Sequence, residues 1–202
     1  MRGLPLPRSR SANRPHRPYR YLVYLLAALA LLVIPAVASA AKGFTEQVAS
    51  ARWLIPFQCP DGSTAADGRL IVEMDNFIEA GTTPDPNPPL RVGFVGLCPD
   101  GTFSWGFVQA APTQFGTDLK KVSVSGTFSN VRDNRGGLHA VSVDASWVGT
   151  GPITTSVNGP GSKRKERPAS ATATIVFDGN TLVDGAANFL FPAPFIRVDT
   201  EK

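Results

Sequence analysis

The sequence contains few of the residues from which metal and redox sites are usually built. Its 202 residues include two cysteines, Cys59 and Cys98, which are too few for a disulfide-dense scaffold or a four-cysteine zinc site. They do not form a Cys-x-x-Cys pair, which argues against a redox role. His139 is the single histidine after residue 40, so it has no second histidine at ligand spacing. We therefore expect no metal site and no cofactor.

Nucleophilic catalysis has equally little support in the sequence. There is no Gly-x-Ser-x-Gly elbow, so a Ser-His-Asp set would have to combine His139 with a distant serine. His139 follows Gly136 and Gly137, a position typical of a half-exposed residue at the edge of a hairpin. We predict no catalytic residue, and the sequence favours a protein that is not an enzyme.

Charged residues make up 18% of the chain and are unevenly placed. A net charge of +4 would ordinarily indicate a nucleic-acid or anionic membrane partner. However, residues 1–40 hold six of the twenty basic residues and none of the sixteen acidic ones, which leaves fourteen basic against sixteen acidic residues after them. We therefore predict no nucleic-acid partner.

The first forty residues are predicted to be a targeting segment. Residues 1–20 are basic, residues 21–34 form an uncharged apolar run, and Pro35 precedes the small-residue triplet Ala38-Ser39-Ala40. This order is typical of a signal peptide cleaved after residue 40, which leaves residues 41–202 as an exported domain. The alternative is an uncleaved anchor, in which residues 21–40 cross the membrane as a helix of about 30 Å. Both predict a secreted or cell-envelope protein, and the composition favours a bacterial source.

After residue 40, apolar and polar residues alternate between regularly spaced turn signals. This pattern predicts an all-β domain, an antiparallel sandwich or barrel of about eight strands. The expected strands cover residues 51–58, 69–78, 90–97, 102–110, 119–130, 138–149, 169–178 and 181–191. The predicted core faces comprise Phe103, Trp105 and Phe107; Val122, Val124 and Phe128; Val141, Val143, Ala145 and Trp147; and Ala171, Ala173, Ile175 and Phe177.

Two long connections are predicted. Residues 81–89 contain four prolines, which exclude regular structure and indicate a stiff loop. Residues 157–168 combine turn-forming residues with a basic run, which predicts a long exposed loop with a solvated tip.

A short motif, Cys-Pro-Asp-Gly, occurs at residues 59–62 and again at 98–101. Its last three residues suit a tight turn, so each cysteine is expected at a strand end. Because an exported protein with an even number of cysteines oxidises them, we predict a disulfide between Cys59 and Cys98. The carboxylates of Asp61 and Asp100 are weak evidence for calcium, which needs six to eight oxygens.

The outward positions of three predicted strands carry short hydroxyl side chains and almost no long charged ones. Such a surface is typical of contact with a polysaccharide or with another envelope protein. The competing explanation is structural, because Thr favours strands and Ser is tolerated on a solvated face. The candidate binding residues are Ser123, Ser125, Thr127, Ser142, Asp144, Ser146, Thr172 and Thr174.

Two functional hypotheses fit these features. The first is a non-enzymatic cell-envelope or extracellular binding or interaction module that uses the Ser/Thr surface and the two loops. The second is a closed barrel that carries a small apolar ligand, or a cofactor-free isomerase in which Glu73, Asp75 or His139 transfers the proton. They differ in whether the aromatic residues fill the interior or line a cavity, which alternation alone does not decide.

Overall fold

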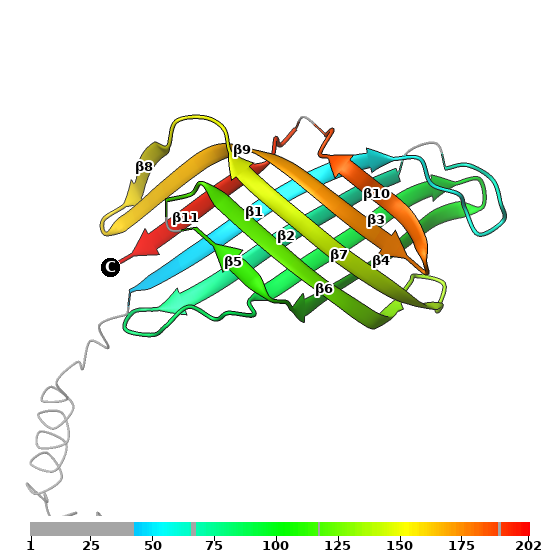
Figure 1. The fold of residues 1–202 in the computed structure, drawn as a ribbon, viewed down its shortest axis with the longest axis horizontal. Coiled ribbons are helices and arrows are strands. Elements are labelled where there is room, and N and C mark those ends of the chain that lie inside the picture. Colours follow the sequence, from blue (N-terminus) through cyan, green and yellow to red (C-terminus); the bar gives the residue numbers. More distant parts are fainter. Residues whose placement is uncertain (1–42, 66–67, 117, 190) are drawn as a thin grey trace, which may run out of the picture. The chain divides into compact units, whose positions relative to one another are not determined.

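The computed structural model describes residues 43–65, 68–116, 118–189 and 191–202. The predicted signal peptide, residues 1–40, lies outside the described residues. The regular structure of the described part is all-β (Figure 1), and no helix in it is long and apolar enough to cross a membrane. The strands are β1 Phe44–Ile55, β2 Gly68–Glu79, β3 Pro89–Cys98, β4 Gly101–Ala110, β5 Thr113–Phe115, β6 Lys121–Arg132, β7 Leu138–Gly149, β8 Thr154–Gly159, β9 Ser162–Phe177, β10 Asn180–Ala186 and β11 Phe195–Glu201.

The strands form one antiparallel sheet, which confirms the all-β, antiparallel part of the predicted fold class. Their order is β4-β3-β2-β1-β11-β9-β7-β6-β5, and β8 and β10 each pair with β9. The order has two ends and does not return to its first strand, so the sheet is not closed. The barrel form of the prediction is therefore not the form that the chain adopts.

Strand β9 joins the two halves of this sheet. Its residues up to Pro168 pair with β11 and β8, and its residues from Ala169 onward pair with β7 and β10. The sheet folds over on itself around this strand, so β6, β7, β9 and β10 lie across β1 to β4 (Figure 1). Aromatic rings meet between the two layers. Trp105 of β4 stacks on Phe177 of β9 with ring centroids 5.1 Å apart.

The core lies between the two layers and follows the predicted faces. Small and β-branched residues alternate inward along β6, β7 and β9 because they pack well on a pleated surface. Trp53, Phe94 and Trp147 are almost fully buried and occupy the interior. The predicted inward residues of β6 and β7 are buried, as are Phe103 and Trp105, whereas Phe107 and Phe177 are partly buried against the core.

The strand count and several boundaries differ from the prediction. The structure has eleven strands rather than eight. Strand β1 begins at Phe44 rather than at residue 51, and the strand expected over 181–191 ends at Ala186 and is followed by the unexpected β11. Pro192 and Pro194 separate these last two strands, because proline removes a ladder donor.

The prediction of a long exposed loop over residues 157–168 is wrong. The segment consists of the end of β8, a turn at Pro160 and Gly161, and the first half of β9. Its basic run belongs to a paired strand: the Nε of Arg164 donates to Asp199 at 2.7 Å, and the Nε of Arg167 donates to the Gly151 carbonyl at 2.8 Å. Lys163 and Lys165 lie on either side of Arg164 in the chain and are exposed.

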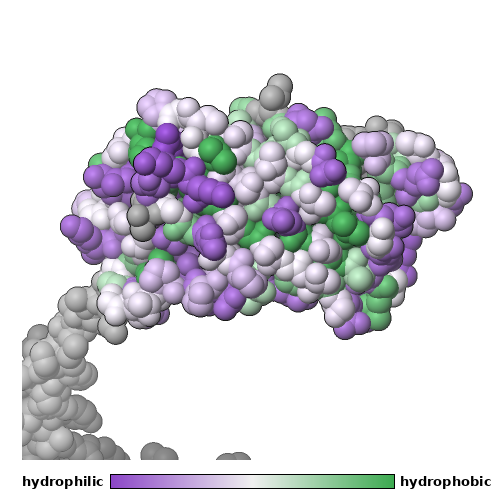
Figure 2. All heavy atoms as spheres, in the orientation of Figure 1, coloured by the Kyte–Doolittle hydropathy of each residue, from purple (hydrophilic) through white to green (hydrophobic). Residues whose placement is uncertain are grey.

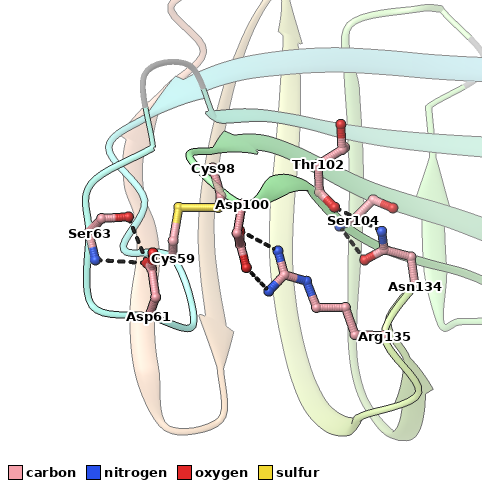
Figure 3. Close-up of a disulfide and its surroundings, with 9 residues drawn as sticks. All are labelled: Cys59, Asp61, Ser63, Cys98, Asp100, Thr102, Ser104, Asn134 and Arg135. Atoms are coloured by element: carbon pink, nitrogen blue, oxygen red, sulfur yellow. Dashed lines mark hydrogen bonds and ion pairs between the residues drawn. A yellow bond between two sulfur atoms is a disulfide. The ribbon is translucent and has the colours of Figure 1, made fainter.

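The predicted disulfide is present and lies at the end of the sheet shown in Figure 3. It joins the Cys59 turn to the β3–β4 turn and is compatible with an extracellular location. Asp61 accepts hydrogen bonds from the Ser63 backbone and hydroxyl at 3.0 and 2.6 Å. Asp100 accepts two from the guanidinium of Arg135, at 2.7 and 2.8 Å. Both carboxylates therefore hold turns in place.

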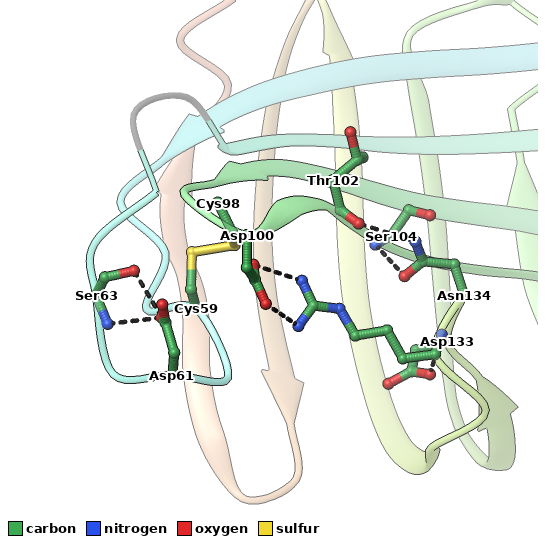
Figure 4. A network of polar contacts seen from close by, with 10 residues as sticks. Cys59, Asp61, Ser63, Cys98, Asp100, Thr102, Ser104, Asp133 and Asn134 are labelled. Carbon is green, nitrogen blue, oxygen red and sulfur yellow. Dashed lines mark hydrogen bonds and ion pairs between the residues drawn. A yellow bond between two sulfur atoms is a disulfide. The ribbon is translucent and has the colours of Figure 1, made fainter.

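The β6–β7 turn is also hydrogen-bonded directly to β4. The side chain of Asn134 donates to the Thr102 carbonyl at 2.9 Å and accepts from the Ser104 backbone at 3.0 Å (Figure 4). Because β4 and β6 belong to opposite layers, these bonds and the Arg135–Asp100 pair hold the two layers together at this end.

Candidate functional site

The structure brings the eight predicted binding residues onto one face of β6, β7 and β9. The strand register places Ser123 opposite Ser146, and Ser146 opposite Thr172. A parallel row runs from Ser125 through Asp144 to Thr174, and Thr127 lies opposite Ser142. Apart from Gly126, which is partly buried, their neighbours along each strand are buried, so all eight point away from the core.

A groove of about 400 Å³ lies at the β5 edge of this face. Three of the predicted residues, Ser123, Ser125 and Asp144, form part of its lining. The rest comes from segments that the sequence did not connect with the face: Pro86 and Asn87 of the proline-rich loop, and Pro112, Thr113 and Gln114 at the start of β5, together with Val124.

The proline-rich loop is irregular, as predicted, and is fixed beside β5. The backbone of Thr113 donates to the Pro86 carbonyl at 3.0 Å, and the backbone of Ala111 donates to the Pro88 carbonyl at 3.2 Å. The buried side chain of Asn76 also donates to the Asp85 carbonyl, at 3.2 Å. One wall of the groove is therefore preorganised by backbone bonds and fixed proline φ angles.

The polar side chains at the groove differ from those farther along the face. Away from the groove, Ser146 and Thr172 share a hydrogen bond of 3.0 Å, and Thr174 donates to Asp184 at 3.1 Å. At the groove, the hydroxyls of Ser123 and Ser125 and the carboxylate of Asp144 make no hydrogen bond with the described side chains or backbone. These three groups are free to bind a ligand.

Comparison with protein-family models, curated proteins and solved structures finds no match to this chain. The character of the site therefore rests on its own chemistry. In Figure 2 the surface over β6, β7 and β9 is mostly pale, with intermediate hydropathy, and strongly hydrophilic residues gather toward the β8 end. The face is thus neither an apolar patch nor a strongly charged surface.

The second hypothesis relied on Glu73, Asp75 and His139, and the structure does not bring these three side chains together. Glu73 lies on the outward face of β2, where it forms an ion pair with Arg91 at 3.6 Å. Asp75 shares that face, whereas His139 points between the layers and packs on Phe177 with ring centroids 4.4 Å apart. The described residues contain no group of three His, Cys, Asp or Glu side chains placed to hold a metal ion.

His139 is held between two carboxylates. Its Nδ1 lies 2.7 Å from Asp178 Oδ2, and its Nε2 lies 2.9 Å from Asp133 Oδ2. The side chain is 16% exposed, less than the half-exposed hairpin residue that the sequence suggested, because the β6–β7 hairpin folds the ring inward. Both ring nitrogens are bonded to the protein, as expected of a structural histidine.

These contacts set the charge of the His139 cluster. Burial lowers the pKa of His139, but hydrogen bonds to Asp133 and Asp178 and their negative charges outweigh it, so the pKa is raised above 6.5. The hydrogen bond from His139 is the main cause that lowers the pKa of Asp133, against its burial. Burial raises the pKa of Asp178, yet hydrogen bonds from His139 and the Ala140 N–H lower it overall. The folded state therefore favours an imidazolium between two carboxylates.

Because of this cluster, we expect the folded protein to lose stability as the pH rises. A histidine whose pKa is higher in the folded than in the unfolded protein stabilises the folded state. This stabilisation is complete below the pKa of the unfolded state, about 6.5, and is lost as the pH rises through the pKa of the folded state. We expect the wild-type melting temperature to fall over this range, by about 2 to 4 °C for each kcal/mol lost. Thermal melts followed by circular dichroism should show no such fall for His139→Gln. Parallel pH profiles for the two proteins would contradict the assignment.

Proposed function

We propose that the chain is an exported, non-enzymatic binding module that holds a neutral polysaccharide at the cell envelope or outside the cell. The observation that carries the proposal is the groove that the free side chains of Ser123, Ser125 and Asp144 line together with Asn87 and Gln114. Hydroxyls, amides and a carboxylate can donate to and accept from sugar hydroxyls in both directions. No Lys or Arg is among the described lining residues, which favours a neutral ligand over an anion.

The rest of the Ser/Thr face supports a polymer as the ligand. From the groove, the hydroxyl rows continue across β7 and β9 through Ser146, Thr172 and Thr174. Short side chains keep this surface flat, so a chain seated in the groove can continue over it without meeting long side chains. A small molecule would fit within the groove and would not contact this extension of the surface.

Export is the second part of the proposal. It is supported by the order of basic, apolar and small residues in positions 1–40, which is typical of a signal peptide. The Cys59–Cys98 disulfide is consistent with it, because disulfides persist in oxidising compartments.

Asp144→Ala is the sharpest test of the groove. Loss of one charged acceptor should weaken binding to soluble neutral polysaccharides by about 10- to 100-fold, since hydrogen bonds to charged groups contribute about 1.5 to 3 kcal/mol. Affinity electrophoresis against a panel of glucans, mannans and xylans measures the change. Because Asp144 is exposed, the melting temperature should stay within about 2 °C of wild type.

Glu201→Ala provides the matched control. Glu201 is also an exposed acid, but it lies at the end of β11, outside the groove and the Ser/Thr face. Its loss should leave polysaccharide binding within about twofold of wild type. Equal losses in the two variants, or unchanged binding by Asp144→Ala, would be evidence against the groove as the binding site.

A further inference from the structure

A second groove, of about 500 Å³, lies on the outer face of the other layer. Its lining includes Arg52 of β1, Ile71 of β2, Gly93 of β3 and Ser104 of β4. These residues point outward, because the residues beside them in the chain, Trp53, Leu70, Phe94 and Trp105, are buried. The volume is within the range of about 300 to 1,000 Å³ that small-molecule sites usually have.

The floor of this groove is bare backbone bordered by apolar side chains. Gly93 lies opposite Gly106 of β4, so two adjacent strands present no side chain at this point. A Cβ placed on Gly93 would meet the side chain of Ile71 at 3.4 Å. The floor is therefore open to a ligand that can lie flat against the sheet.

One wall is formed by Phe189, which is fixed beside β1. Strand β11 leaves the edge of β1 after the Ser50–Phe195 pair, and the segment 188–189 takes its place. The side chain of Asn188 bonds to both the N–H and the carbonyl of Leu54, at 2.7 and 2.9 Å, and the Phe189 N–H donates to the Arg52 carbonyl at 3.4 Å. The Phe189 ring lies 5.8 Å from the guanidinium of Arg69.

Arg52 gives the groove an unsatisfied cationic donor. Its Nε is buried and has no hydrogen-bond partner in the described part of the chain. The Nε is enclosed and out of reach of a ligand, but the rest of the guanidinium makes no hydrogen bond with the described residues and is the part that an oxyanion in the groove can bind. The described lining contains no acid that would compete for the Arg52 guanidinium.

From this combination we infer that the groove binds an amphiphile with a carboxylate head and an apolar chain. The carboxylate accepts from the Arg52 guanidinium, whose planar donor arrangement matches it. The chain lies on the bare floor at Gly93, between Phe189 on one side and Val95 on the other. This groove and the Ser/Thr face belong to different layers, so the two sites can be tested independently.

The test compares decanoate, decanol and decyltrimethylammonium on the purified protein, kept free of detergent because detergents are themselves amphiphiles. Amide NMR titrations should show decanoate shifting the signals of Gly93 and Ser104. Decanoate should bind at least about tenfold more tightly than the alcohol or the cation, because only it brings a negative charge to the Arg52 guanidinium. Equal affinities for the three probes, or shifts confined to other residues, would overturn the inference.

Variants separate the head group from the chain. Arg52→Gln should weaken decanoate binding by about 10- to 100-fold and leave decanol binding unchanged. Gly93→Val fills the floor of the groove and should weaken the binding of both decanoate and decanol. The matched control is Arg91→Gln, which removes an arginine from the same outward face but from a pair with Glu73, and should change neither affinity by more than about twofold. Full decanoate affinity in Arg52→Gln would overturn the inference.

Discussion

Replacing both Cys59 and Cys98 with alanine is expected to lower the free energy of unfolding by about 4 kcal/mol. The disulfide closes a stretch with a sequence separation of 39 residues, so its loss lets the unfolded chain sample many more conformations. Cys59 is also buried at 4% exposure, in the connection between β1 and β2. Urea unfolding followed by tryptophan fluorescence measures the difference.

Reduction of the wild-type protein provides an independent comparison for the disulfide. Wild type in the presence of a reductant should unfold at nearly the urea midpoint of the double variant, because both lack the same covalent link. The double variant itself should not respond to the reductant. If wild type is equally stable with and without the reductant, or if the variant loses less than about 1 kcal/mol, the disulfide does not contribute as argued.

The sequence predicts the parts of this fold that alternate apolar and polar residues. In β6, β7 and β9 beyond Pro168 the buried faces were recognisable because Val, Ala, Ile and Trp recur at every second position. The first half of β9 alternates just as regularly, but between exposed lysines and partly buried Arg164 and Glu166. Its stability comes from strand pairing and from the contact of Arg164 with Asp199, 35 residues away, which a search for apolar periodicity does not detect.

The candidate site shows the same division between local pattern and distant contact. Residue parity alone placed Ser123, Ser125 and Asp144 on one face, and the structure brings them together. The groove, however, depends on Asn87, which reaches it because the proline-rich loop is bonded to β5, and on Gln114, which reaches it because β5 pairs with β6. Likewise, no pattern in the sequence places Phe189 beside Arg52, because the hydrogen bond from the Phe189 N–H to the Arg52 carbonyl joins distant parts of the chain.

Trp105→Ala is expected to have an effect of similar size to loss of the disulfide, about 3 to 5 kcal/mol. The side chain is 4% exposed and lies between the layers, stacked on Phe94 and Phe177 with centroids 5.8 and 5.1 Å apart. The Trp105 backbone also bridges to Asp133, where β4 meets the β6–β7 turn. Truncation therefore opens a cavity where the two layers are joined. Urea unfolding at constant pH measures the loss, and a loss below about 1 kcal/mol would contradict this account of the core.

Substitution by phenylalanine separates packing from hydrogen bonding. The indole Nε1 of Trp105 is buried without a hydrogen-bond partner in the described structure, so Trp105→Phe removes volume and relieves an unsatisfied donor. The Nε1 of Trp53 donates instead to the Gly185 carbonyl at 3.3 Å. Trp53→Phe should therefore cost about 1 kcal/mol more than Trp105→Phe, although both lose the same atoms. If Trp105→Phe is the more destabilising of the two, Trp105 contributes through a polar contact rather than through packing between the layers.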